Sequence, residues 1–346
     1  MSLDLPLIWA GIIAVAVLLY VLLDGFDLGI GILFPFARSP ADRDTMMSAI
    51  APYWDGNETW LVLGGGGLLA AFPLAYAILM PALYLPVALM LLALILRGVA
   101  FEFRLHGRRR GKAFWTGAFA VGSLATTLAQ GLILGGFIQG VRVDRGDFGA
   151  QVFAGGAFDW LTPYSLLVAA GLVAGYVLLG AGWLILKTTD ELHGDARRWA
   201  WIALIAVAAL LAAVSLATLF VHPRVAARWG IEAGAIDWAR LARLAVIPLV
   251  GAAGLAIAAI GLARRSHGLP FVGAAVVFLS GYLGLAASFF PMIVPYAVSF
   301  REAANEAGAL GFLLAGTAIL LPMIGAYTAY VYFVFRGKTL ADAGYH

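Results

Sequence analysis

The chain has 346 residues, of which 63% are hydrophobic and only 12% charged, and its formal net charge is +3 at pH 7. Soluble domains are usually about half apolar and a quarter charged, so this composition excludes a soluble globular protein. The sequence contains no cysteine, which excludes disulfides, thiolate metal sites and iron–sulfur clusters held by this chain. The small positive charge does not indicate nucleic acid as a partner, because Lys and Arg in membrane proteins mainly report topology.

The N-terminal segment is expected to be the first membrane span and not a cleavable signal peptide. Residues 1–5 contain no basic residue, and the apolar run from Pro6 to Leu23 is longer than the core of a signal peptide. Apolar blocks of about 20 residues, the length needed to cross hydrocarbon, then recur along the chain.

We predict an all-α membrane protein with about nine transmembrane helices. Only Pro73 and a few residues near Pro81 separate the second span from the third, so eight spans remain an alternative. The expected organisation is a single integral membrane domain over 1–346, with a first four-helix bundle over 1–135, a second over 162–290 and one peripheral last helix. The predicted spans are 6–34, 54–73, 76–104, 113–135, 162–187, 199–220, 243–263, 270–290 and 309–335.

The distribution of Lys and Arg predicts the orientation of these spans. With the N-terminus outside, the inner segments carry about twice as many Lys and Arg residues as the outer segments. The arginine-rich loop 221–242 is the weakest part of this pattern, because it would lie outside. We expect the N-terminus on the outer side and the C-terminus on the inner side.

A faint internal repeat links the first and fifth predicted spans. The first contains Tyr20-Val-Leu-Leu-Asp24-Gly25 and the fifth contains Tyr176-Val-Leu-Leu-Gly180-Ala181. A parallel duplication would give the two four-helix bundles. Chance similarity between helices rich in Leu, Val and Gly explains the match equally well.

Charged residues inside the predicted spans are few, and a charge at membrane depth is costly, so each is a candidate for function. Asp24 and Asp27 are three residues apart and share a helix face, and Asp55 and Glu58 repeat this spacing at the start of the second span. Arg97 lies in the third span. The topology brings all five toward the inner half of the membrane.

Two interpretations of these charges remain open. The acids could form a proton-conducting or ion-coupling route that opens to the cytoplasm, which we favour for Asp24, Asp55 and Glu58. Alternatively, they could form a static ion-pair cluster that locks three helices together, with Arg97 and Glu102 as its structural pair. Glu102 and Arg104 lie at the inner end of the third span, where long side chains also reach the interface.

No histidine lies in the middle of a predicted span. A heme buried in a helix bundle needs His or Met ligands at depth, and the deep methionines have no deep histidine as a partner. We therefore expect no heme, no metal site and no catalytic residue in this chain. The histidines are His106, His193, His222, His267 and His346.

Three clustered motifs resemble subunit II of cytochrome bd-type quinol oxidases. They are Asp24-Gly25-Phe26-Asp27-Leu28-Gly29-Ile30-Gly31, then Ala51-Pro52-Tyr53-Trp54-Asp55-Gly56-Asn57-Glu58-Thr59-Trp60, then Arg97-Gly98-Val99-Ala100-Phe101-Glu102-Phe103-Arg104. The segment Phe290-Pro291-Met292-Ile293-Val294-Pro295 resembles the outer loop before the last helix. The Glu58-Thr59 pair is similar to the cyanide-insensitive branch, whereas Tyr296 stands where a serine is usual.

The resemblance implies a bacterial cytoplasmic (inner) membrane complex that oxidises quinol and reduces dioxygen to water, electrogenically but without pumping protons. It implies a heme-bearing subunit I that holds two hemes b and one heme d or a third heme b, and a possible small single-helix subunit. Membrane lipids and quinol are further expected partners. This chain would support subunit I and help to deliver protons, and possibly oxygen, to the oxygen-reducing heme.

The resemblance also implies roles for single residues. Asp55 matches the acid on the cytoplasmic proton route, Asp24 and Asp27 match neighbouring acids, and Trp60 matches a tryptophan near a proposed oxygen entrance. The role of Glu58 is our inference from its position. The alternative function is a proton-coupled secondary transporter, since intramembrane acids, a glycine-interrupted helix and a repeat also occur there. A purely structural subunit is a third possibility.

Overall fold

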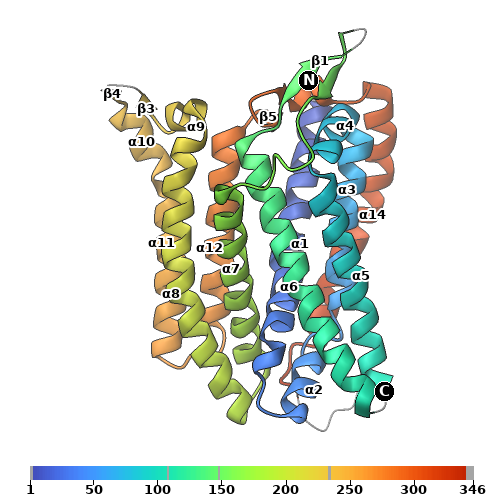
Figure 1. The fold of residues 1–346 in the computed structure, drawn as a ribbon, viewed down its shortest axis with the longest axis vertical. Coiled ribbons are helices and arrows are strands. Elements are labelled where there is room, and N and C mark those ends of the chain that lie inside the picture. Colours follow the sequence, from blue (N-terminus) through green and yellow to red (C-terminus); the bar gives the residue numbers. More distant parts are fainter. Residues whose placement is uncertain (1–2, 107–108, 147–148, 233–234, 340–346) are drawn as a thin grey trace.

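Long helices standing side by side form the body of the protein in a computed structural model (Figure 1). The structure describes residues 3–106, 109–146, 149–232 and 235–339, with no side-chain detail for 105–110. The side chain of His106 and the whole of His346 therefore lie outside the described residues.

The all-α membrane class is confirmed. The long helices are α1 Leu5–Leu33, α3 Trp54–Ala71, α4 Pro73–Ala82, α5 Tyr84–His106, α6 Arg109–Gln139, α7 Pro163–Lys187, α8 Asp190–Val221, α11 Val246–Ala263, α12 Leu269–Phe289 and α14 Ala307–Val334.

Short elements connect the long helices at the two ends of the molecule. The helical connectors are the 3-10 turn η1 Phe34–Phe36 and the helices α2 Pro40–Ser48, α9 Pro223–Arg228, α10 Trp238–Leu244 and α13 Phe300–Ala303. Six short strands pair as antiparallel hairpins, β1 Val143–Arg145 with β2 Gln151–Phe153, β3 Ile231–Glu232 with β4 Ala235–Ile236, and β5 Met292–Val294 with β6 Val298–Ser299.

Eight helices among the described residues are long and apolar enough to cross a membrane, and a bent pair, α3 with α4, raises the number to nine. The pair bends by 119° at Phe72. Pro73 starts α4 because proline needs no hydrogen-bonded N–H in the first turn of a helix. The predicted third span, 76–104, is therefore wrong at its start, since residues 76–82 belong to α4 and α5 begins at Tyr84.

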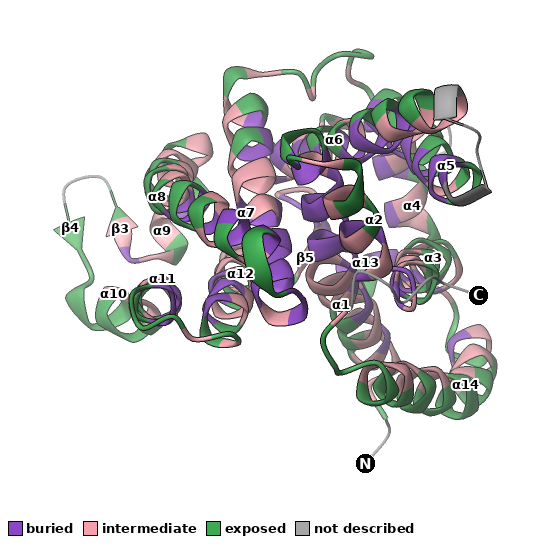
Figure 2. Ribbon diagram, turned by 90° about the horizontal axis from the view of Figure 1, so that it is seen from below, coloured by how far each residue is buried: buried purple, intermediate pink, exposed green. Residues whose placement is uncertain are grey.

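The helices fall into two groups with α14 at the edge. Helices α1, α3, α5 and α6 pack in one group, and α7, α8, α11 and α12 in the other. Contacts of α7 with α1 and with α6 join the groups. Helix α14 lies against α1 and α3 and is largely exposed (Figure 2), with Leu310 as its one fully buried residue.

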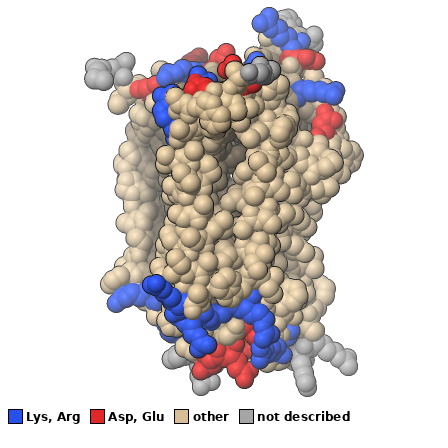
Figure 3. Space-filling model, turned by 90° about the vertical axis from the view of Figure 1, so that its left-hand side faces the viewer, with Lys and Arg blue, Asp and Glu red and all other residues tan. Residues whose placement is uncertain are grey.

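Charged side chains gather at the two ends of the molecule. The face in Figure 3 has a wide band without Lys, Arg, Asp or Glu, bordered above and below by charged residues. Such a band fits the hydrocarbon core of a bilayer, in which exposed charge is costly. The N-terminus lies at the upper end and the C-terminus at the lower end of Figure 1.

Helices α1 and α7 cross so closely that glycine is required at the contact. A Cβ on Gly29 would lie 1.8 Å from the carbonyl oxygen of Tyr176, and a Cβ on Gly180 would lie 2.6 Å from the backbone nitrogen of Ile30. Small residues at such crossings let two membrane helices approach backbone to backbone. The two similar segments meet beside this crossing, where a Cβ on Gly25 would lie 2.7 Å from the ring of Tyr176.

A C-terminal strap, residues 335–339, ties α14 to the lower end of α7. The ammonium group of Lys187 is buried and donates to the hydroxyl of Tyr53 at 2.9 Å, to the carbonyl of Phe335 and to the carbonyl of Gly337 at 3.3 Å. The backbone N–H of Thr339 donates to the carbonyl of Lys187 at 2.8 Å. The strap thus satisfies a buried cation with neutral oxygens.

Gly29→Ala is expected to destabilise the protein, because the new methyl group has no room between α1 and α7. Overpacking of this kind costs about 1–3 kcal/mol. The midpoint of thermal unfolding in detergent, followed by circular dichroism, measures the effect. Gly11→Ala is the matched control on the same helix, since nothing lies within 4 Å of its Cβ position. Equal midpoints for the two variants would contradict the close crossing.

Candidate functional site

Three helices bring charged residues together in the lower half of the membrane-spanning region. Asp24 and Asp27 lie in the last third of α1, Glu58 lies in the second turn of α3, and Arg97 lies beyond the middle of α5. Helices α1 and α5 run downward while α3 starts at the lower end, so the three positions fall at a similar depth (Figure 1). We name these four residues with Asn57 the carboxylate–arginine cluster.

Arg97 is the centre of the cluster. Its Nη1 donates to Asp24 Oδ1 at 2.7 Å and to Glu58 Oε1 at 2.8 Å. Its Nη2 lies 3.9 Å from Asp27 Oδ2, an ion-pair contact. The side chains of Arg97, Asp24 and Asp27 are buried, whereas the side chain of Glu58 is 26% exposed. Glu58 is therefore the member of the cluster that reaches the surface of the chain.

Asn57 hydrogen-bonds to Asp27 and is itself held by Tyr332. The amide nitrogen of Asn57 donates to Asp27 Oδ2 at 2.7 Å and to the carbonyl of Leu23 at 3.2 Å. The hydroxyl of Tyr332, from α14, donates to Asn57 Oδ1 at 2.9 Å. The peripheral helix thus takes part in positioning a buried acid.

The cluster has more hydrogen-bonding capacity than it uses. Asp24 Oδ2, Asp27 Oδ1 and the Nε and Nη2 atoms of Arg97 are buried and have no hydrogen-bond partner. With three ionised carboxylates and one guanidinium, the formal charge would be −2. Buried polar atoms are normally paired with protein groups or ordered water, so these atoms offer places for water molecules or exchangeable protons.

A second polar chain lies next to Asp24. The side chain of Gln130, on α6, donates to the hydroxyl of Tyr20 at 2.6 Å and accepts from the hydroxyl of Tyr176 at 2.8 Å. Both tyrosine rings are buried. These tyrosines occupy equivalent positions in the two similar segments, and Gln130 joins them across the boundary between the two helix groups.

The structure places the other expected residues outside the cluster. Asp55 is exposed on the outer face of α3, and its carboxylate makes no hydrogen bond or ion pair with any described residue. Trp60 is buried against Ala16 and Tyr20 of α1, with Leu321 and Ile324 of α14 beside it, and its Nε1 has no partner. A role for Trp60 at an oxygen entrance stays a prediction.

The expected ion pair between Arg97 and Glu102 is not formed. Five residues along a helix rotate a side chain by about 140° around the axis, so Glu102 points away from the face that carries Arg97. Glu102 is exposed, and the partners of Arg97 are the carboxylates of α1 and α3. Arg104 is buried and pairs instead with Asp44 of α2 at 2.7 Å.

Sequence reasoning missed Asn57, Tyr332 and Gln130. Asn57 stands between Asp55 and Glu58 in the second motif, so its position between two candidate acids indicated that it could belong to the site. Tyr332 and Gln130 carry no such signal, because each comes from a helix remote in sequence from its partner.

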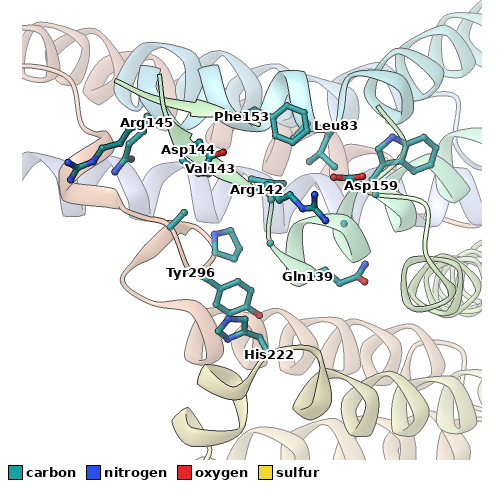
Figure 4. A pocket seen from close by; sticks show the side chains of 18 residues that line it. Leu83, Gln139, Arg142, Val143, Asp144, Arg145, Phe153, Asp159, His222 and Tyr296 are labelled. Atoms are coloured by element: carbon teal, nitrogen blue, oxygen red, sulfur yellow. The ribbon is translucent and has the colours of Figure 1, made fainter. Parts of the chain in front are cut away.

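A separate cavity of about 850 Å³ opens at the upper end of the molecule (Figure 4). The β1–β2 hairpin and the loop before α13 line it, with Arg142 and Asp159 on one side and Tyr296 with His222 on the other. The ring of His222 stacks on Tyr296 at 3.9 Å between centroids. This cavity lies at the opposite end from the carboxylate–arginine cluster.

The histidines with described side chains lie near the two ends of the molecule. His193 and His267 face each other at the lower end, and His222 accepts a hydrogen bond from the backbone N–H of Arg224 at the start of α9. Among the residues with described side chains, no three His, Cys, Asp or Glu residues are grouped closely enough to hold a metal ion.

Arg97→Gln is expected to destabilise the protein strongly, because it leaves Asp24 and Glu58 without their cation inside the protein. Breaking a buried ion pair by removing one partner costs about 3–5 kcal/mol. Thermal unfolding of Arg97→Gln, Asp24→Asn and the double variant forms a cycle that measures the coupling.

The control is Arg301→Gln, which breaks the exposed pair between Arg301 and Asp4. Exposed ion pairs contribute little to stability, so this variant should unfold close to the unaltered protein. An Arg97→Gln variant as stable as the Arg301→Gln variant would show that the cluster does not hold α1, α3 and α5 together.

Comparisons with known proteins agree on one family. A family model described as cytochrome bd terminal oxidase subunit II matches residues 5–335. The chain is 33% identical over 201 residues to cytochrome bd-I ubiquinol oxidase subunit 2 of Escherichia coli (strain K12), covering 58% of this chain and 53% of that one. It is 31% identical over 214 residues to cytochrome bd ubiquinol oxidase subunit 2 of Bacillus subtilis (strain 168), covering 59% and 62%. The matches thus span between half and two thirds of the length of these relatives.

A solved structure shares the fold. A chain in the structure of bd oxidase from Geobacillus thermodenitrificans superposes with a TM-score of 0.74 at 17% identity, over 97% of this chain and 100% of that one. This likeness extends over both helix groups and supports the arrangement of the long helices. The chain belongs to the cytochrome bd terminal oxidase subunit II family.

Proposed function

We propose that this chain is the second subunit of a bd-type quinol:dioxygen oxidoreductase, in which a separate heme-bearing subunit carries out the redox chemistry. The chain would support that subunit and supply protons for dioxygen reduction from the cytoplasmic side. The carboxylate–arginine cluster carries this proposal, because it is a buried set of titratable groups with one member, Glu58, at the surface of the chain.

Proton delivery through hydrocarbon needs titratable groups and water in succession. Reduction of one dioxygen to two waters consumes four protons, which cannot cross an apolar medium unaided. Asp55 is exposed on α3 and stands one helical turn before Glu58, and Glu58 hydrogen-bonds to Arg97 beside Asp24 and Asp27. A proton could pass from Asp55 to Glu58 and then into the cluster, whose formal charge of −2 makes proton uptake favourable.

The expected partner surface adjoins this entrance. The outer face of α3 exposes Thr59, Val62 and Leu69, and no atom lies within 4 Å of the Cβ positions of Gly65 and Gly66. Small residues on an exposed membrane helix permit close approach of a helix from another chain. The heme-bearing subunit would dock here, beside Asp55 and Glu58.

The distribution of basic residues supports a cytoplasmic lower end. Among the described residues, more Lys and Arg residues belong to the connections at the end that carries the C-terminus than to those at the N-terminal end. Positive charge is enriched on the cytoplasmic side of membrane proteins. We infer that the N-terminus is periplasmic and that the acids open toward the cytoplasm of a bacterium.

Glu58→Gln and Asp55→Asn are expected to slow oxygen consumption by the purified complex while leaving its heme content unchanged. A positioned proton-transfer group typically contributes about 10²-fold or more to a rate, so the loss should reach that size for the residue that limits proton entry. Oxygen uptake with excess quinol, and heme absorbance on the same samples, provide the two readings.

Asp144→Asn is the matched control, because Asp144 is an exposed acid of β1 at the opposite end of the molecule. If heme content falls together with activity, the acids are structural. If all three variants consume oxygen at the normal rate, these acids do not carry protons.

Purification of the chain from its native membrane distinguishes the oxidase from the alternative transporter. The oxidase predicts that heme absorbance co-purifies and that every axial ligand comes from the partner subunit. An axial heme ligand donated by this chain would contradict the proposal that the partner subunit holds the hemes. Proton-coupled flux of a solute by the chain alone, without heme, would favour the transporter.

A further inference from the structure

Five basic side chains converge at the lower end of the second helix group. They come from α8, from the connection between α11 and α12, and from the C-terminal strap. We name this set the lower basic cluster, and its members are His193, Arg197, Arg265, His267 and Lys338. The rings of His193 and His267 lie 5.1 Å apart, and Lys338 Nζ lies 3.4 Å from His267 Nδ1. Arg197 Nη2 and the backbone N–H of Arg265 both donate to the carbonyl of Leu262, which places these two residues together.

The cluster contains a buried guanidinium donor without an acceptor and a buried imidazole nitrogen without a partner. Arg197 Nη1 and His193 Nδ1 are both buried and have no hydrogen-bond partner. The other terminal nitrogen of Arg197, Nη2, donates to the carbonyl of Leu262 near the end of α11. A buried unpaired donor costs free energy, and a cationic one costs more, so an anion that accepts from Arg197 Nη1 would be stabilised at this position.

No carboxylate among the described residues neutralises the cluster. None of its members forms an ion pair there, and Asp195, the acid closest in sequence to Arg197, pairs with Arg38. Positive charge is enriched at the cytoplasmic surface of membrane proteins, which explains why basic residues occur at this end. This effect does not explain why they face one another with Arg197 Nη1 and His193 Nδ1 buried and unpaired.

The surface next to the cluster is apolar and faces the membrane. Ile202 and Ile205 are exposed on α8, and they follow Arg198 by four and seven residues on one helix face. Ile260 is exposed on α11 four residues before Arg264, and Val272 is exposed on α12. Basic side chains line the lower border of the uncharged band on this face (Figure 3). Acyl chains of a lipid held at the cluster would therefore lie against exposed apolar side chains.

We propose that the lower basic cluster binds a phosphate-bearing anion at the membrane surface, supplied either by the headgroup of an anionic phospholipid or by free phosphate. Arg197 Nη1 and the guanidinium of Arg265 donate to phosphate oxygens, and His193 donates through Nδ1 when that nitrogen is protonated. Guanidinium groups suit this chemistry because their paired N–H groups match the spacing of phosphate oxygens. The site is independent of the proposed oxidase activity.

The test compares Arg197→Gln and Arg265→Gln with the unaltered protein, each purified from the membrane with its co-purifying chains. The samples are delipidated and placed in nanodiscs of phosphatidylcholine, with or without phosphatidylglycerol, and phosphatidylcholine samples are also titrated with inorganic phosphate. The thermal unfolding midpoint gives the affinity for each anion. Native mass spectrometry counts bound anionic lipids.

Arg265→Gln separates anion binding from folding, because the Arg265 side chain makes no hydrogen bond or ion pair with a described residue. Its affinity should fall about fivefold, and that of Arg197→Gln about tenfold. Arg243→Gln is the control, since Arg243 is exposed on α10 at the opposite end and bonds only to the carbonyl of Ala239.

Each outcome of this test either supports or contradicts the proposed anion site. Stabilisation by phosphatidylglycerol alone, weakened by the two cluster variants and not by Arg243→Gln, assigns the site to a lipid headgroup. Equal stabilisation by inorganic phosphate in phosphatidylcholine, with the same variant pattern, assigns it to free phosphate. Absence of stabilisation by either anion, or the same loss in Arg243→Gln as in Arg265→Gln, overturns it.

Discussion

The buried guanidinium of Arg97 is the interaction on which the lower half of the first helix group depends. A cation inside a bilayer-spanning protein is costly unless nearby groups compensate it, and the carboxylates of Asp24 and Glu58 do so for Arg97 from two other helices. The same pairing fixes α1, α3 and α5 relative to one another. It also places Glu58 between the buried acids and the exposed face of α3.

The helix crossing at Gly29 and Gly180 positions the second helix group against the first. Backbone contact between α1 and α7 leaves no freedom for either helix to slide, and Gln130 ties a tyrosine from each of them. Helix α14 contributes little burial, yet its Tyr332 positions Asn57 against Asp27. A peripheral helix can therefore matter to a buried site through one hydrogen bond, without a large apolar interface.

Some structural features could not be predicted from short stretches of the sequence. Proline predicts a break near Pro73 but not its angle, which depends on how α4 packs at the upper end against β2 and α13. Glu102 was expected to form the structural ion pair with Arg97. Helical rotation separates them, and acids 39 and 73 residues away take that place. The convergence of His193, Arg197, Arg265, His267 and Lys338 likewise depends on segments that are remote along the chain.

The sequence by itself determined the membrane class, the approximate helix positions and which charged residues lie within the spans, since apolar length, helical periodicity and rare intramembrane charges are local properties. Its three motifs also indicated the family. Tertiary structure decided which acid Arg97 binds, that Asp55 is exposed while Asp24 and Asp27 are buried, and that Asn57 and Tyr332 belong to the site. The reason is physical: ion pairs and hydrogen bonds between helices depend on how those helices rotate and cross, and packing over the whole molecule sets both.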